Sequence, residues 1–163
     1  NGVGDAEVNV DCDYLKAREF QLKRDNPQWK KSAEDDVTSM RTGIMGYKGR
    51  VHYHCAPCID AWLDTINPET PKTEVFDIIA KHIDHEIHRN YRLYPSNFIA
   101  FDKLTSQNEH ADRYTAKEHD SFMEYIAGQL AKIDLPAKDE AFLTERMLTM
   151  YAYPAINFIK ARQ

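Results

Sequence analysis

Apolar side chains recur every four positions through residues 72–91, and this pattern constrains the fold more than any other feature of the sequence. The stripe consists of Val75, Ile79, Ile83 and Ile87, widened by Phe76 and Ala80. In a helix, residues three or four positions apart lie on one face. Pro71 suits the first turn, because its missing N–H would have no partner there. We therefore expect a long helix over 72–91 with a buried apolar face.

Helix signals recur along most of the remaining chain. Ser32 with Asp35, and Thr115 with Glu118, resemble capping boxes, and Asp13 is expected to cap the first helix. The expected helices cover about 14–23, 33 to 44 or 45, 96–104, 115–134 and 138–151, followed by a short one opened by Pro154. The sequence therefore predicts a mostly helical chain.

Two short segments indicate strands instead. Residues 50–55 alternate between Val51, Tyr53 and Cys55 on one side and Arg50, His52 and His54 on the other, a period of two that is typical of a strand. Val8–Val10 alternates more weakly. An isolated strand pair is only marginally stable, so we expect these strands to belong to a larger sheet. The predicted fold class is α/β, as a mostly helical piece with one or two strands.

Composition excludes several classes of protein. The chain has 163 residues, of which 42% are hydrophobic, and this content is too high for a disordered chain. The formal charge of −5, without a concentrated basic run, argues against a nucleic-acid partner. No apolar run approaches the roughly 20 residues of a membrane-spanning helix. Three cysteines suit a reducing, cytoplasmic setting better than a disulfide framework.

The segment from His52 to Cys58 gathers donors that zinc prefers. His52, His54, Cys55 and Cys58 lie within seven residues, and Cys55-x-x-Cys58 alone would suit a redox pair. On a strand, however, Cys55 points away from the two histidines, and the chain has no second cysteine pair. We favour ordinary residues at a strand end over a metal or redox site.

Titratable side chains also follow one another along the predicted helix 72–91. His82, His85 and His88 are three positions apart, and each such step turns a side chain back by about 60°, so the three cannot converge on one ion. Glu86 lies close to the apolar stripe and requires a partner if it is buried. An ion pair with His82 or Arg89 is favoured over a role as general base.

Arginines near the end of the same helix suggest a binding site for an anion. Arg89 and Arg92 flank the helix end, with Arg41, Lys48 and Arg50 as further donors, and guanidinium groups suit phosphate or carboxylate. Arginine at a helix C-terminus is equally explained by the helix dipole. No phosphate loop, nucleophile elbow or His-x-x-x-x-Asp pair is present. The residues alone thus predict no catalytic group, metal or cofactor.

Several phrases of the sequence resemble the C-terminal half of bacterial glycerolipid acyltransferases of the 1-acyl-glycerol-3-phosphate acyltransferase type, particularly the larger forms in Bacteroides relatives. These phrases are Cys12–Pro27, Lys30–Gly43, Gly46–His52, Glu86–Asn97 and Met150–Pro154. The resemblance covers residues 11–163 as the C-terminal part of an acyltransferase-like domain, and residues 1–10 are an uncertain N-terminal segment. A first residue of Asn1 in place of methionine agrees with the expectation that the chain is part of a longer protein.

The resemblance implies an activity whose catalytic residues lie elsewhere. Such proteins transfer a fatty acyl group from a thioester carrier to a lysophospholipid-like hydroxyl at the cytoplasmic membrane surface. Their His-x-x-x-x-Asp pair and phosphate-binding motif are absent from this chain, so the resemblance carries over no catalytic residue. It leaves Arg41, Arg50, Arg89 and Arg92 as residues that would flank an acidic headgroup.

Two other hypotheses remain open from the sequence. The first is a noncatalytic helical module that binds a lipid surface or a partner protein. The second is a metal-binding domain that uses His52, His54 and Cys58.

Overall fold

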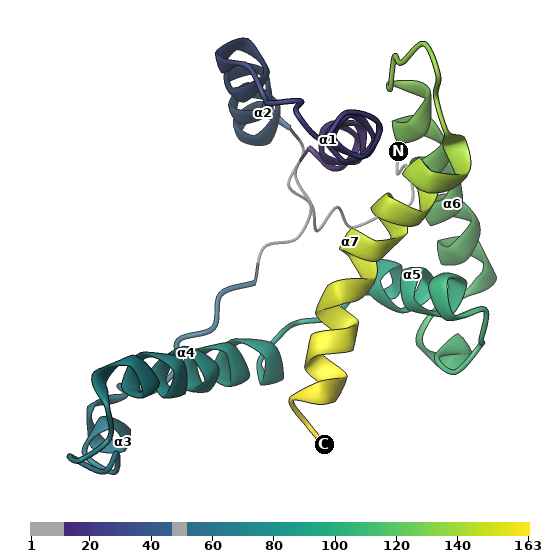
Figure 1. Ribbon diagram of the computed structural model, residues 1–163. Helices are drawn as coiled ribbons and strands as arrows, with labels where there is room; N and C mark the ends of the chain where they lie inside the picture. Colours follow the sequence, from purple (N-terminus) through teal and green to yellow (C-terminus); the bar gives the residue numbers. More distant parts are fainter. Residues whose placement is uncertain (1–11, 47–51) are drawn as a thin grey trace. The chain divides into compact units, whose positions relative to one another are not determined.

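The computed structural model describes residues 12–46 and 52–163, and all of their regular structure is helical. Figure 1 shows its helices in chain order. They are α1 (Asp13–Asp25), α2 (Ala33–Met45), α3 (Asp60–Leu63), α4 (Lys72–Arg89), α5 (Pro95–Thr105), the 3₁₀ turn η1 (Ala111–Arg113), α6 (Ala116–Ala131) and α7 (Glu140–Lys160). The predicted α/β class is therefore wrong for the described part of the chain.

The segment expected to be a strand explains this difference. Residues 52–58 form no regular structure, and every one of them is exposed. A strand requires a neighbouring strand to pair its backbone groups, and the described residues contain none. Water can satisfy an exposed backbone instead. Val8–Val10, Arg50 and Val51 lie outside the described residues.

The chain divides into two compact units. The first unit comprises residues 1–51 and 93–155, and the second comprises residues 52–92 and 156–163. Helix α7 contributes residues to both units. The assignment of 11–163 to the C-terminal part of a larger domain stays a prediction, because this division concerns the chain alone.

Apolar side chains from α5, α6 and α7 form the core of the first unit. Figure 1 shows the ribbons of these three helices next to one another. Ile99, Phe122, Ile126, Leu143 and Met147 are each at most 2% exposed. Both predicted capping boxes are confirmed, since Ser32 accepts from the Asp35 N–H and Thr115 from the Glu118 N–H. The expected helical stripes of α6 and α7 therefore supply this core.

Helix α7 is longer than expected. Pro154 lies inside it instead of opening a separate helix, although an interior proline removes one backbone hydrogen bond and crowds the preceding turn. Around it, Tyr151, Ala152 and Ala155 are completely buried. The packing of this segment outweighs the local preference of proline, so the prediction of two helices is wrong.

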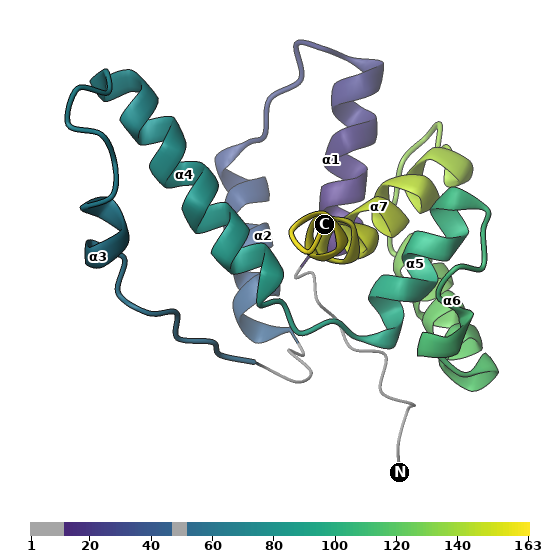
Figure 2. The same cartoon turned by 90° about the horizontal axis from the view of Figure 1, so that it is seen from below.

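The second unit contains α3 and α4, which lie alongside each other in Figure 2. The Trp62 ring of α3 stacks on the His82 ring of α4, with 3.7 Å between centroids and 8° between planes. No residue of α4 is fully buried, and Phe76 is 72% exposed, Ile87 49% and Ile83 40%. The helix is where the sequence predicts it, but the expected burial of its apolar face is wrong. Apolar spacing places the side chains on one face of a helix, but it does not determine whether another element covers that face.

Candidate functional site

A buried carboxylate lies at the start of α1. Asp13 is 2% exposed, and it is the first residue of the helix, following Cys12, whose φ of 61° is left-handed. The hydroxyls of Tyr125 and Tyr151 donate to Asp13 Oδ2 over 2.7 and 2.8 Å, and the Tyr14 N–H donates to Oδ1. Asp13 was expected to be the cap of α1, but its carboxylate instead joins α1 to α6 and α7.

The two tyrosines around Asp13 are held as neutral donors. Burial raises the pKa of Tyr151, and the negative charge of Asp13 raises it further. Burial is also the main cause of the raised pKa of Tyr125. Phenol groups that keep their protons can satisfy a buried carboxylate, which would otherwise be costly.

Asn97 extends this cluster to α5. Its side chain is completely buried, donates to the Tyr151 carbonyl over 2.8 Å, and accepts from the Tyr94 N–H over 2.9 Å. Asp13, Tyr151 and Asn97 are all at most 2% exposed, so a substrate has no access to them. This polar cluster holds helices together and is a poor candidate for catalysis.

A second buried carboxylate organises the turn after α5. Asp102 is 3% exposed and accepts from the Tyr114 hydroxyl at 2.9 Å and from the His110 N–H at 3.2 Å. The pKa of Tyr114 is raised, first by burial and then by its hydrogen bond to Asp102. Because its partners are a backbone group and a neighbouring phenol, Asp102 fixes the loop around η1.

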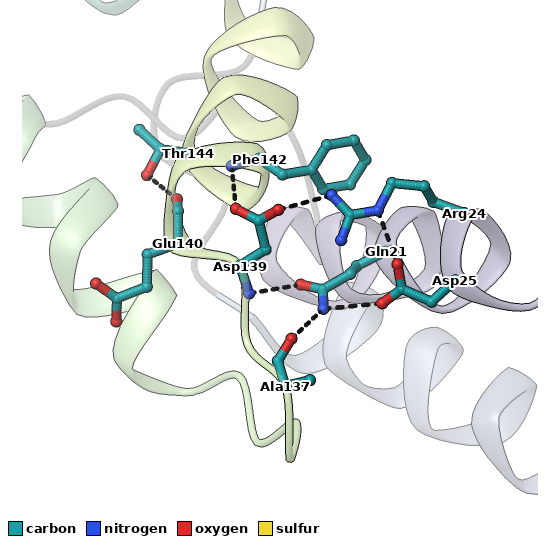
Figure 3. A network of polar contacts seen from close by, with 8 residues as sticks. All are labelled: Gln21, Arg24, Asp25, Ala137, Asp139, Glu140, Phe142 and Thr144. Carbon is teal, nitrogen blue, oxygen red and sulfur yellow. Dashed lines mark hydrogen bonds and ion pairs between the residues drawn. The ribbon is translucent and has the colours of Figure 1, made fainter.

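A polar network joins α1 to the beginning of α7, as Figure 3 shows. Gln21, 2% exposed, donates to the Ala137 carbonyl over 2.7 Å and accepts from the Asp139 N–H over 3.1 Å. Asp139 accepts from the Phe142 N–H and pairs with Arg24 at 2.8 Å. These two contacts, the first being the stronger, lower the pKa of Asp139. The network fixes the entry into α7 and is structural.

The four predicted arginines belong to different parts of the chain. Arg41 is exposed on α2, in the first unit, whereas Arg89 and Arg92 belong to the second unit. Arg89 pairs with Glu86 over 3.2 Å, which confirms the expected ion pair within the helix. Arg50 lies outside the described residues. A headgroup site built on these arginines stays a prediction.

The predicted metal donors are dispersed along exposed chain. His52, His54, Cys55 and Cys58 are all exposed, and no group of three or more His, Cys, Asp or Glu residues within 12–46 and 52–163 is arranged to hold a metal ion. On α4, His82 stacks on Trp62, while the His88 ring approaches Tyr91 with 5.5 Å between centroids. The α4 histidines therefore make separate contacts.

Two helices present apolar side chains to solvent. The α4 face consists of Val75, Phe76, Ile79, Ile83 and Ile87, of which Phe76 is the most exposed at 72%. The α2 stripe consists of Ala33, Val37, Met40 and Ile44, with Val37 and Met40 each 64% exposed and Ile44 71%. Exposed, contiguous apolar surfaces mark interaction sites. Sequence periodicity identified the α4 face but assigned it to the core.

Comparisons of the chain with protein-family models, with curated proteins and with solved structures find no match. Among the described helices, none combines the length and the apolar character that crossing a membrane requires. The α4 face and the α2 stripe are thus the best candidates for function that the described residues offer.

Proposed function

We propose that this chain is a noncatalytic helical module that binds a partner protein through the α4 face. The exposure of this face carries the proposal: Phe76 is 72% and Ile87 49% exposed on a helix of 18 residues. Helices in proteins gain most of their stability when an apolar face packs against another surface. An apolar groove or a second amphipathic helix on a partner would cover it, with anchors at intervals of three and four residues.

Charge favours a protein over a lipid surface as the partner. Helix α4 carries three basic side chains, Lys72, Lys81 and Arg89, against four acidic ones, Glu74, Asp77, Asp84 and Glu86, which is 3 − 4 = −1. Helices that lie on membranes have a polar face rich in lysine and arginine, because anionic headgroups attract it. Peripheral attachment to the cytoplasmic membrane is therefore the weaker alternative.

The acyltransferase hypothesis stays a prediction. It rests on the sequence phrases alone, and it assigns catalysis to residues that this chain lacks. The polar cluster around Asp13 lends it no support, because Asp13 and Tyr151 are at most 2% exposed and a substrate has no access to them. A thioester-hydrolysis and acyl-transfer assay on this chain tests where catalysis lies. We expect no turnover, and turnover by this chain would refute the assignment of catalysis to residues outside it.

Photo-crosslinking from two sides of α4 tests the proposed function. A photoreactive phenylalanine analogue replaces Phe76 on the α4 face or Lys81, which lies about 170° from the centre of that face at 100° per residue. We expect the Phe76 probe, and not the Lys81 probe, to crosslink one protein in cells. The purified partner should bind the chain, and Phe76→Glu with Ile83→Glu should weaken binding at least tenfold.

Cosedimentation with vesicles tests the alternative that the α4 face binds a lipid surface. Cosedimentation with vesicles that contain anionic phospholipid should recover little of the wild-type chain, and the same amount of the Phe76→Glu variant. Equal crosslinking from both positions, or vesicle binding that Phe76→Glu abolishes, would refute a protein partner at the α4 face.

A further inference from the structure

Helix α2 turns its polar side inward and its apolar side outward. Its inner side meets α1, where the Ser39 carbonyl accepts from Cys12 Sγ at 3.0 Å and Asp35 pairs with Arg18 at 3.7 Å. The opposite side carries the α2 stripe, with Val37 64% and Ile44 71% exposed. A stripe that faces away from the core of its own unit requires a separate explanation.

The α2 stripe is narrow and straight. At 100° per residue, Ala33, Val37, Met40 and Ile44 fall within an arc of about 60°, and Asp35 and Ser39 lie more than about 120° from its centre. A stripe this narrow suits the contact between two helices better than it suits a broad core, where several neighbouring elements cover one helix. A stripe of this shape fits another helix, and the charges beside the stripe indicate which one.

Two opposite charges lie on the same side of the stripe, at opposite ends of the helix. Glu34 and Arg41 are about 70–90° from the centre of the stripe in the same direction, while Asp36 lies about 70° away in the other direction. Glu34, Asp36 and Arg41 are all exposed. Neither Glu34 nor Arg41 has an ion-pair partner among the described residues. Their charges are available to a neighbouring chain.

This arrangement is complementary to itself when two copies run antiparallel. A two-fold axis brings the same side of both helices together in opposite directions, so Glu34 of each copy faces Arg41 of the other. The midpoint between Glu34 and Arg41 differs by one residue, about 1.5 Å, from that between Ala33 and Ile44. A parallel pair would instead place Glu34 beside Asp36 of the other copy.

We propose that the α2 stripe is a self-association surface, through which two copies of this chain pair their α2 helices antiparallel, with Arg41 of each beside Glu34 of the other. The helix has 13 residues and is therefore about 20 Å long, so the interface is small and we expect a weak, reversible dimer. This surface lies on a different helix from the α4 face, and the proposal stands independently of the proposed function.

Sedimentation velocity of the complete chain over a range of concentrations tests the dimer. We expect reversible dimerisation, and we expect Val37→Glu or Ile44→Glu to raise the dissociation constant at least tenfold. Both side chains are exposed, so circular dichroism should remain unchanged. A wild-type chain that stays monomeric at hundreds of micromolar would overturn the proposal, as would a dimer lost with Phe76→Glu and kept with Val37→Glu.

Charge exchange tests the antiparallel geometry. Arg41→Glu and Glu34→Arg should each raise the dissociation constant about three- to tenfold, and the double variant should return to within about twofold of wild type. Lys30→Glu, at an exposed position outside α2, should have no effect. Glu34→Gln and Arg41→Gln form a second pair of variants, which remove the charges without placing a positive charge in the first turn of α2. Single-variant losses that the exchange does not restore would refute the pairing of Glu34 with Arg41.

Discussion

Helices α6 and α4 carry similar apolar patterns, but their apolar faces differ in exposure between the two units of the chain. In the first unit, Phe122 and Ile126 of α6 are 2% and 1% exposed. In the second unit, Phe76 and Ile87 of α4 are 72% and 49% exposed. Spacing alone therefore does not decide whether an apolar face becomes core. The number of neighbouring helices decides it, because each can cover only part of a face.

Matched phenylalanine truncations test this contrast with the largest expected effect. Phe122→Ala removes a buried ring and should lower the free energy of unfolding by about 3–5 kcal/mol, whereas Phe76→Ala should change it by less than about 0.5 kcal/mol. Each unit contains one tryptophan, Trp29 or Trp62. Urea unfolding followed by fluorescence in Trp62→Phe or Trp29→Phe backgrounds reports each unit separately. A large loss from Phe76→Ala would show that the α4 face is covered in solution.

Removal of the buried carboxylate should have the next largest effect. Asp13→Ala removes the acceptor of both tyrosine hydroxyls, that of the buried Tyr151 and that of the half-buried Tyr125, which should cost about 2–4 kcal/mol of unfolding free energy. Asp13→Asn keeps one acceptor oxygen and should cost less. Asp112→Ala, at a side chain that is 77% exposed, is the control. Equal urea midpoints for Asp13→Ala and the control would contradict the structural role of the cluster.

Alkaline pH should destabilise the first unit selectively. The folded-state pKa values of Tyr125 and Tyr151 are raised above the ordinary 10.0, so the unfolded chain loses these protons first. Stability is complete below about pH 10 and falls above it, by up to about 1.4 kcal/mol per pH unit for each proton retained only by the folded state. Urea unfolding between pH 8 and 11 measures the slope, which Tyr151→Phe should reduce.

The ion pair on α4 should contribute least. Glu86 and Arg89 are three positions apart, with side chains 23% and 52% exposed. Such pairs stabilise a helix by about 0.2–0.5 kcal/mol and are screened by salt. Glu86→Gln should lower the stability that Trp62 reports by that amount at low salt, and by nothing measurable at 1 M salt. A loss that persists in high salt would indicate a buried role for Glu86.

Local features of the sequence predicted the positions of the helices. The capping boxes at Ser32 and Thr115 set the starts of α2 and α6 because their hydrogen bonds span only three residues. Period-two alternation at 50–55 and the proline at 154 gave wrong predictions because they, too, are local features. Both are local preferences, and the surroundings decided otherwise. Residues 52–55 have no partner strand within 12–46 and 52–163, and packing held α7 together around Pro154.

The polar clusters had no comparable signal. Asp13 meets Tyr151 across 138 positions of sequence, and the Asp139 N–H meets Gln21 across 118. No periodic pattern relates residues so far apart, although an aspartate directly before a helix, as at Asp139, indicates an N-cap. The sequence predicted the candidate interaction surfaces only in part, because periodicity identified the α4 face but not its exposure.

The sequence by itself determined most of the helical segments, though not α3 or the continuity of α7, and which residues share a face, because caps, prolines and apolar spacing act over a few residues. Only the tertiary structure decided that Phe122 is core and Phe76 is surface. It also decided that α2 turns Ser39 inward and Val37 outward. The reason is physical: burial depends on which helices meet, and those meetings join residues that local rules do not connect.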